Sequence, residues 1–221
     1  MKKPWQKWEI KAAIRGSLLS QKQAEEIERA LCAYFPGVSI QKLCTSSTGD
    51  LDQITSLRSQ ENTDFFTKEI DEKVLSGLAD VAIHSAKDMP SALPDGLEII
   101  ALTEGIDPTD SLVFRKGISL SSFPCKGRVG ASSIRREEMV KKTLPQAVFV
   151  DIRGSVPKRL ARLRIDLDAV VVAEAALLRL GSSLFRIPLE GKTHPMQGRL
   201  AVVAKTSCTA VKKLFSTIDG R

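Results

Sequence analysis

A short apolar run that ends in a lysine–aspartate pair is the stretch best suited to chemistry, and residues 80–90 read DVAIHSAKDMP. Residues 80–84 predict a short buried strand, and Pro90 prevents a long helix after it. In open α/β sheets, ligands bind just beyond the carboxyl ends of the strands, which is where Lys87 and Asp88 would lie. An acid beside a cation suits proton transfer and charge stabilisation at one reacting centre. The alternative interpretation is a surface ion pair on a loop.

The elements that must position this pair alternate between strands and helices. Strands are predicted at residues 8–14, 38–44, 80–84, 97–102, 128–131, 147–152, 169–173 and 200–204. Helix starts are predicted at Ser20, Thr67, Ser132 or Ser133, Pro157 and Thr209. Residues 51–64 and 182–197 show no clear period and are predicted to be loops. This alternation predicts an α/β protein with mainly parallel sheets.

The sequence DPTD at residues 107–110 marks a break in the pattern. We place a crossover into a second domain near residue 104, and we expect the strand at 200–204 to return to the first domain. Domain 1 is therefore expected to comprise residues 1–104 and 190–221, and domain 2 residues 105–189.

Polar residues recur where the predicted strands end. They are Arg15, Asp50, Lys87 with Asp88, Ser132 with Ser133, Arg135 with Arg136, and Arg153. Together they predict one arginine-rich cleft between two domains, with Asp88 as its conspicuous acid.

Arg135 and Arg136 fall in the first turn of a predicted helix, where positive charge is unfavourable for the helix alone. A bound anion would compensate them, because a helix N-terminus offers free N–H groups. The alternative is two solvated arginines that diverge by about 100° around the helix. Arg159 lies near the start of the next helix, whereas Arg162 and Arg164 are interpreted as ordinary surface charge.

The composition restricts the possible partners. The chain has 221 residues and a net charge of +7, which favours an anionic partner. Only 5% of the residues are aromatic and no nucleic-acid-binding motif is visible, so we expect no nucleic-acid partner. There is no membrane-length apolar run and no secretory signal. The four cysteines lack metal-ligand spacing, so we expect no metal, reduced thiols and a cytoplasmic location.

Four motifs resemble those of one enzyme family. They are HSAKDMP at 84–90 with LPDGL at 93–97, VGASSIRR at 129–136, DIRGSV at 151–156 followed by Arg159 and Leu160, and LLRLG at 177–181. In this order and spacing they resemble the porphobilinogen deaminase (hydroxymethylbilane synthase) family, over roughly residues 10 to 215. These are transferases of porphyrin, haem and other tetrapyrrole biosynthesis.

The resemblance implies two α/β domains like those of type II periplasmic binding proteins, each with a mainly parallel sheet flanked by helices and with the active-site cleft between them. It implies condensation of four porphobilinogen units into hydroxymethylbilane with release of ammonia, primed by a dipyrromethane cofactor. Asp88 is similar to the catalytic acid. The residues similar to those that bind acetate and propionate groups are Arg15, Ser17, Lys87, Ser132, Ser133, Arg135, Arg136, Arg153, Arg159 and Arg179. Asp50 is a further candidate in the cleft.

The chain departs from the family pattern at three places. We expect the family's third domain, which carries the attachment cysteine, to be absent, and no cysteine of this sequence is identified as its equivalent. A primer would then be held noncovalently or by another thiol. Residues 59–64, SQENTD, replace a basic, glycine-rich lid motif, and Arg199 replaces a small residue.

Three hypotheses follow from these features. The first is an active deaminase, expected to be a monomer unless a separate partner supplies the third domain. The second is a catalytically impaired binder of porphobilinogen, a linear tetrapyrrole or another polycarboxylate. Nucleic-acid binding, the third, is supported by net charge alone.

Overall fold

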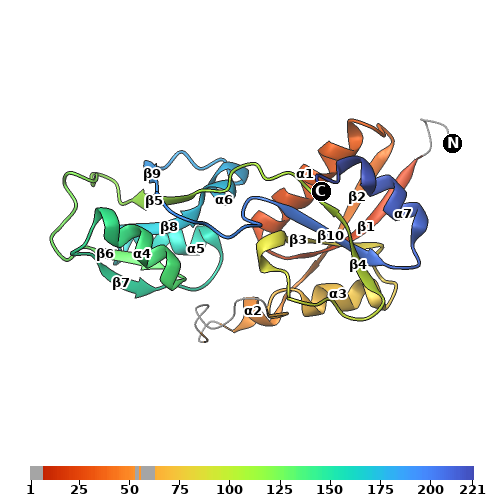
Figure 1. The fold of residues 1–221 in the computed structure, drawn as a ribbon, viewed down its shortest axis with the longest axis horizontal. Coiled ribbons are helices and arrows are strands. Elements are labelled where there is room, and N and C mark those ends of the chain that lie inside the picture. Colours follow the sequence, from red (N-terminus) through yellow and green to blue (C-terminus); the bar gives the residue numbers. More distant parts are fainter. Residues whose placement is uncertain (1–6, 53–54, 56–62) are drawn as a thin grey trace. The chain divides into compact units, whose positions relative to one another are not determined.

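The computed structural model describes residues 7–52, 55 and 63–221 (Figure 1). By their internal contacts these residues form two units, each described by itself below. Unit 1 comprises residues 7–51, 63–105 and 199–221, and unit 2 comprises residues 52, 55 and 106–198. Residues 190–198, which we expected in domain 1, therefore belong to unit 2. The physical reason is that Gln197 donates hydrogen bonds to the carbonyl groups of Pro108 and Thr109, each at 2.9 Å.

Unit 1 is built on a five-stranded sheet (Figure 1). In spatial order its strands are β2 (Val38–Thr45), β1 (Trp8–Arg15), β3 (Val81–Ser85), β10 (Leu200–Lys205) and β4 (Leu97–Leu102). β1 pairs in parallel with β2 and β3, whereas β10 runs antiparallel to both of its neighbours. Four strands therefore run in one direction, as the mainly parallel prediction requires, and β10 opposes them.

Helices cover both faces of this sheet. They are α1 (Leu18–Cys32), α2 (Thr48–Leu51), α3 (Lys68–Leu75) and α7 (Thr209–Phe215), with 3-10 turns η2 (Ala86–Asp88) and η4 (Ser216–Ile218). α1 and α7 pack on one face through side chains such as Ile27 and Phe215. α3 packs on the other face through Ile70 and Val74. Alternate residues of each strand belong to the two cores, because successive side chains of a strand point to opposite faces of the sheet.

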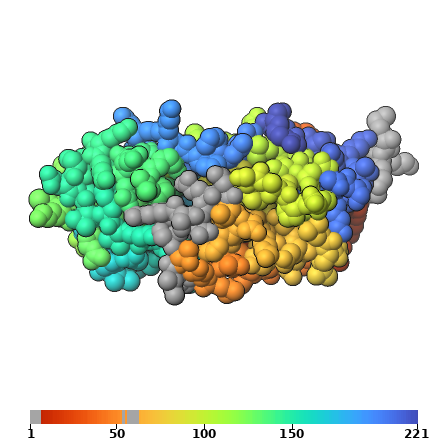
Figure 2. Space-filling model, turned by 60° about the horizontal axis from the view of Figure 1, so that its bottom comes forward, coloured from red at the N-terminus to blue at the C-terminus, as the bar shows by residue number. Residues whose placement is uncertain are grey.

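The C-terminal segment of the chain completes unit 1. β10 lies between β3 and β4, so a segment near the end of the sequence separates two strands from its first half. Figure 2 shows this adjacency on the surface, where the C-terminal segment in blue lies beside the yellow-green segment around β4. Residues 200–205 therefore lie in unit 1, where we expected this strand to return.

Unit 2 has a second five-stranded sheet with the same pattern of strand directions, but its antiparallel strand comes first in the unit, not last. Its strands, in spatial order, are β7 (Val148–Asp151), β6 (Arg128–Ala131), β8 (Ala169–Ala173), β5 (Asp110–Phe114) and β9 (Arg186–Pro188). β6 is parallel to β7 and β8, and β5 runs antiparallel to β8 and β9. The helices are α4 (Ile134–Thr143), α5 (Val156–Ala161) and α6 (Glu174–Arg179), with the 3-10 turn η3 (Arg162–Arg164).

The two faces of the second sheet are packed differently. α4 contributes Met139 and Val140 to a core with alternate residues of β5, β6 and β8. On the opposite face Gly130 leaves room for other side chains, since a Cβ there would lie 2.7 Å from Leu167 and 2.9 Å from Ile152. This close approach explains why β6 contains a glycine at a fully buried position.

Two local predictions are wrong, and a third is not tested by the described residues. α1 begins at Leu18 and is capped by Ser17, not Ser20, because the extended backbone of Ser17 lets its hydroxyl accept the Ser20 N–H at 3.1 Å. The predicted loop at 182–197 contains β9, which pairs with the edge of β5. The predicted loop at 51–64 falls mostly outside the described residues, as does most of the 59–64 segment.

Candidate active site

Asp88 ends the turn that follows the central strand β3. β3 is buried along most of its length, and residues 86–88 then form η2, which Met89 closes by donating its N–H to the Ala86 carbonyl at 3.4 Å. The side chain of Asp88 is partly buried and makes no hydrogen bond or ion pair with any described residue. Lys87 is also partly buried in this turn. The sequence therefore placed both residues correctly at a strand end.

A small pocket in unit 1 contains Asp88 and will be called the Asp88 pocket. Its lining residues are Arg15, Ser20, Gln23, Phe66, Thr67, Ile83, His84, Ser85 and Asp88. They come from the end of β1, the first turns of α1, the two residues before α3, the end of β3 and η2. Gln23 is buried and donates to the Ser85 hydroxyl at 2.8 Å, which fixes this wall. Among these residues the carboxylate of Asp88 is an ionisable group held without a salt bridge.

Arg15 is engaged inside unit 1. Its guanidinium forms a two-point ion pair with Asp50, with Nε 3.1 Å from Oδ2, and it stacks over the Phe66 ring at 4.3 Å. Burial of Asp50 opposes its ionisation, but the hydrogen bonds and charge of Arg15, with those from Ser47, outweigh burial and lower the pKa of Asp50. Asp50 thus serves as an internal partner of Arg15. Ser17, a second predicted ligand residue, serves as the N-cap of α1.

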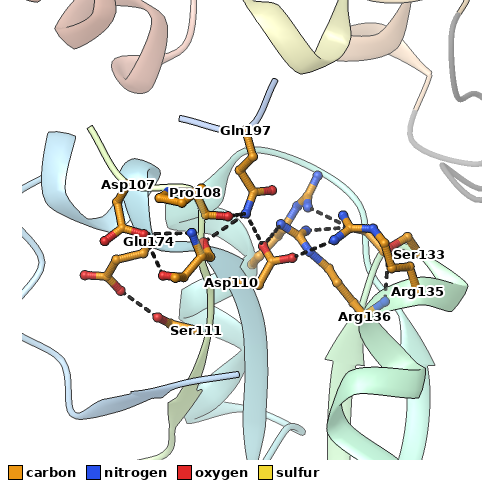
Figure 3. Close-up of polar contacts among 12 residues, drawn as sticks. Asp107, Pro108, Asp110, Ser111, Ser133, Arg135, Arg136, Glu174 and Gln197 are labelled. Carbon is orange, nitrogen blue, oxygen red and sulfur yellow. Dashed lines mark hydrogen bonds and ion pairs between the residues drawn. The ribbon is translucent and has the colours of Figure 1, made fainter. Parts of the chain in front are cut away.

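In unit 2 a buried carboxylate organises the predicted arginines (Figure 3). Asp110 begins β5 and its side chain is 0% exposed. Its carboxylate accepts from Arg136 Nη2 at 2.5 Å, Arg135 Nη1 at 3.2 Å and Gln197 Nε2 at 3.1 Å. We expected an external anion to compensate the two arginines, whereas the anion beside them is a carboxylate of the chain itself.

The two arginines differ in exposure and therefore in what they can contact. The Arg136 side chain is 7% exposed and also donates to the Ser132 hydroxyl at 3.2 Å. The Arg135 side chain is 33% exposed and donates from Nη1 to the Lys192 carbonyl at 3.1 Å. Arg135 can therefore present its remaining N–H groups to a ligand, while Arg136 acts mainly inside the protein.

Two further predicted residues of unit 2 contact Arg136 or its partner Ser132. Arg159 donates from Nη1 to the Ser132 hydroxyl at 3.3 Å and from Nε to the Gly154 carbonyl at 2.7 Å. Ser133 caps α4 by accepting the Arg136 N–H at 3.4 Å. Ser132, Ser133, Arg135, Arg136 and Arg159 will be called the unit 2 arginine cluster.

Two predicted arginines bond elsewhere in unit 2. Arg153 donates to the Asp52 carbonyl, and Arg179 donates to the Gly198 carbonyl at 2.8 Å. Gly198 has φ of +86°, and a Cβ at this position would lie 2.4 Å from the Asp107 carbonyl oxygen. Arg179 thus binds the backbone at Gly198, a position whose conformation and close approach to Asp107 favour glycine.

Sequence reasoning missed the residues that hold the candidate site in place. Asp110 was interpreted only as part of a break, although two neighbouring arginines signal the need for a carboxylate. The buried pair of His84 and Asp71, with Nε2 2.9 Å from Oδ1, had no signal beyond the apolar context of His84.

The four cysteines are free thiols at four separate places. Cys32 donates to the Val38 carbonyl at 3.4 Å, and Cys44 and Cys125 are exposed. None of the four lines the Asp88 pocket or bonds to the unit 2 arginine cluster among the described residues. Within the described part of the chain, no helix has both the length and the apolar character to span a membrane.

Comparison of the fold with solved structures shows a shared architecture. The reduced regulatory domain of OxyR2 from Vibrio vulnificus superposes with a TM-score of 0.55 at 13% identity, covering 99% of this chain and 97% of that chain. CbnR, a LysR family transcriptional regulator, gives 0.55 at 11% identity, covering 96% and 70%. These similarities confirm the predicted periplasmic-binding-protein-like fold of two α/β units.

Sequence comparison identifies the family. A family model described as porphobilinogen deaminase, dipyromethane cofactor binding domain, matches residues 10–213. The probable porphobilinogen deaminase of Chlamydia muridarum is 44% identical over 210 residues, 94% of this chain and 86% of that protein. The porphobilinogen deaminase of Moorella thermoacetica is 41% identical over 173 residues, 78% of this chain and 55% of that protein. The chain therefore belongs to the porphobilinogen deaminase family, whose members are transferases of tetrapyrrole biosynthesis.

Proposed function

We propose that this protein condenses four porphobilinogen units into hydroxymethylbilane with release of ammonia. The observation that carries the proposal is Asp88, a partly buried carboxylate in a pocket at a strand end, which forms no salt bridge with any residue that the structure describes. Arg15 in the same pocket is already paired with Asp50. Asp88 is therefore available to a substrate amine.

In this proposal Asp88 performs the acid chemistry. Its carboxyl group protonates the aminomethyl nitrogen of porphobilinogen, the carbon–nitrogen bond breaks, and ammonia leaves. The carboxylate that remains faces the positive charge that develops on the pyrrole, which is electrostatic stabilisation of the reacting centre. Partial burial strengthens this interaction because the surroundings screen it less than water does.

The unit 2 arginine cluster fits the acetate and propionate groups of pyrroles. Ser132 accepts hydrogen bonds from two arginines, so its own hydroxyl hydrogen is left to donate to a ligand. Arg135 is one third exposed and provides charged N–H donors beside it. A charge-assisted hydrogen bond contributes roughly 1.5–3 kcal/mol. Several such bonds would hold a growing polycarboxylate between steps.

The same donors suit the carboxylates of the dipyrromethane group named in the family description. When bound, that group supplies the terminal pyrrole to which the first substrate unit is joined. Arg135 and Ser132 would bind its carboxylates. We propose that it is held without a covalent bond, since no thiol meets the candidate site among the described residues.

A second candidate function is binding without catalysis. The positions of the four thiols favour it, because none meets the candidate site residues in the part of the chain that the structure describes. The protein would then bind porphobilinogen, a linear tetrapyrrole or another polycarboxylate. We further propose a monomer in a reducing, cytoplasmic environment, in keeping with four free thiols. Light scattering at several concentrations tests the monomer.

Intact mass spectrometry during incubation with porphobilinogen, with absorbance of the oxidised porphyrin product alongside, tests the proposed reaction. Product without a change in protein mass supports a noncovalent primer, and stepwise additions of pyrrole units reveal an attachment site. Asp88→Asn should abolish product formation while the protein stays folded. Asp95→Asn is the matched control, because Asp95 is exposed in the loop that follows. Equal turnover by Asp88→Asn and the control would refute the role of Asp88.

A further inference from the structure

A buried histidine–aspartate pair lies under the Asp88 pocket. Asp71 on α3 is 1% exposed and His84 on β3 is 3% exposed, with Oδ1 and Nε2 2.9 Å apart. A buried carboxylate is costly unless it is paired, so this contact ties α3 firmly to β3. His84 lies four residues before Asp88 on the segment that leads into the catalytic turn.

The pair has hydrogen-bonding capacity that the described residues leave unused. Asp71 Oδ2 is buried and has no hydrogen-bond partner among the described residues. His84 Nδ1 likewise makes no hydrogen bond in the described part of the chain. In a neutral imidazole, the partner of one ring nitrogen decides where the proton lies. In a neutral ring that donates from Nε2 to an ionised Asp71, Nδ1 carries the lone pair.

The position of His84 gives this lone pair a use. His84 lines the Asp88 pocket together with Ser85 and Asp88. A neutral acceptor in the same pocket as the Asp88 carboxylate suits a ligand that presents N–H groups.

We propose that His84, oriented by Asp71, accepts a hydrogen bond at Nδ1 from an N–H group of the pyrrole substrate bound at Asp88. The donor is either the pyrrole N–H or the aminomethyl ammonium, which share this chemistry. His84 is then a substrate-contacting residue and Asp71 its positioning residue. The inference rests on the proposed function, because it assumes that porphobilinogen binds in this pocket.

Nitrogen NMR of the histidine rings tests the inference directly. The chain has only two histidines, so protein labelled with ¹⁵N-histidine gives two imidazole spin systems, and His194→Gln assigns them. Free protein should show His84 protonated at Nε2 only. Addition of porphobilinogen should shift Nδ1 as a hydrogen bond forms. An analogue with methyl in place of the aminomethyl group gives the same shift if the pyrrole N–H is the donor, and none if the ammonium is.

Calorimetry on the same samples separates the two proposals. Heat of binding without any shift of Nδ1 overturns the inference and leaves the proposed function standing. Absence of heat with porphobilinogen counts against the proposed function itself and removes the ligand on which the inference depends. Protonation of both ring nitrogens in the complex also overturns the acceptor role.

Asp71→Asn tests the positioning role. An asparagine can donate to Nε2 as well as accept from it, so the proton can move to Nδ1 and the acceptor is lost. Affinity for porphobilinogen should fall roughly tenfold, or about 1.4 kcal/mol. Glu72→Gln removes the same charge from an exposed position of α3 and should bind normally. A folded Asp71→Asn with unchanged affinity refutes the role, and if this variant does not fold, the NMR of the natural sequence still decides.

Discussion

Replacing Asp110 with asparagine should destabilise unit 2 strongly, because three side chains share this one carboxylate. Arg136 and Gln197 lie with it in the interior, and Arg135 reaches it from a partly exposed position. Asparagine keeps the shape and one acceptor oxygen. It loses the charge, and its NH₂ group, a donor, faces the N–H donors of a guanidinium with no acceptor between them.

The magnitude follows from the burial of each partner. With charge centres about 4 Å apart and an effective dielectric of about 20, the attraction between Asp110 and buried Arg136 is about 4 kcal/mol. The attraction to Arg135, which is one third exposed, adds at most about 1 kcal/mol after screening. Loss of the desolvation cost of Asp110 offsets part of this sum. We therefore expect a loss of about 3–5 kcal/mol, the range for breaking a buried ion pair.

Hydrogen exchange followed peptide by peptide is the suitable assay, since it reports on unit 2 separately from unit 1. Exchange from β5, β6 and β8 should accelerate in Asp110→Asn. Glu138→Gln, an exposed change on α4, is the control and should leave it unchanged. Adding Arg136→Met should restore part of the loss, because no uncompensated charge then stays buried. Additive destabilisation, or a loss below about 1 kcal/mol, would refute this reasoning.

Three further results are expected. Ser17→Ala removes the N-cap of α1 and should lower the free energy of unfolding by about 1 kcal/mol in urea titration; no change would mean that solvent replaces the cap. Hydrogen bonds from Arg186 lower the pKa of Glu174, so this pair stabilises the fold above the ordinary glutamate pKa of about 4.3 and ceases to do so as the pH falls through the lowered value. Glu174→Gln should therefore lose less stability on acidification than the natural sequence, and equal acid sensitivity would contradict this. Arg135→Gln should weaken porphobilinogen binding about tenfold in calorimetry with little change in unfolding, whereas a purely structural role would reverse that pattern.

The sequence was most informative where a function depends on a strand end. Buried runs of β-branched and small residues located β3, β6 and β8, and the polar residues after them fell where expected. Asp88 and Ser133 could be placed this way because a strand and the turn after it are neighbours in sequence. That the two units contribute to one cleft stays a prediction.

Partners that lie far apart in the sequence could not be predicted from local patterns. Asp110 meets Arg136 across 26 residues, and nothing local to either one specifies the other. The cap of α1 was misassigned because two serines three residues apart both fit the local pattern, and burial of Ser20 with Gln23 decides between them. β9 has only three residues, too few to show a period, and it forms because the edge of β5 accepts it.

The position of β10 has a consequence for how this protein is made. During synthesis β3 and β4 emerge from the ribosome long before β10, because all of residues 106–198 are made between β4 and β10. Until β10 is made, the edges of β3 and β4 that it pairs with stay open, and open strand edges favour pairing with other chains. All five strands of unit 2 lie in the uninterrupted stretch 106–198, so this unit can fold first. Newly made chains should therefore be most prone to aggregation, and most dependent on chaperones, in the interval before residue 205 emerges.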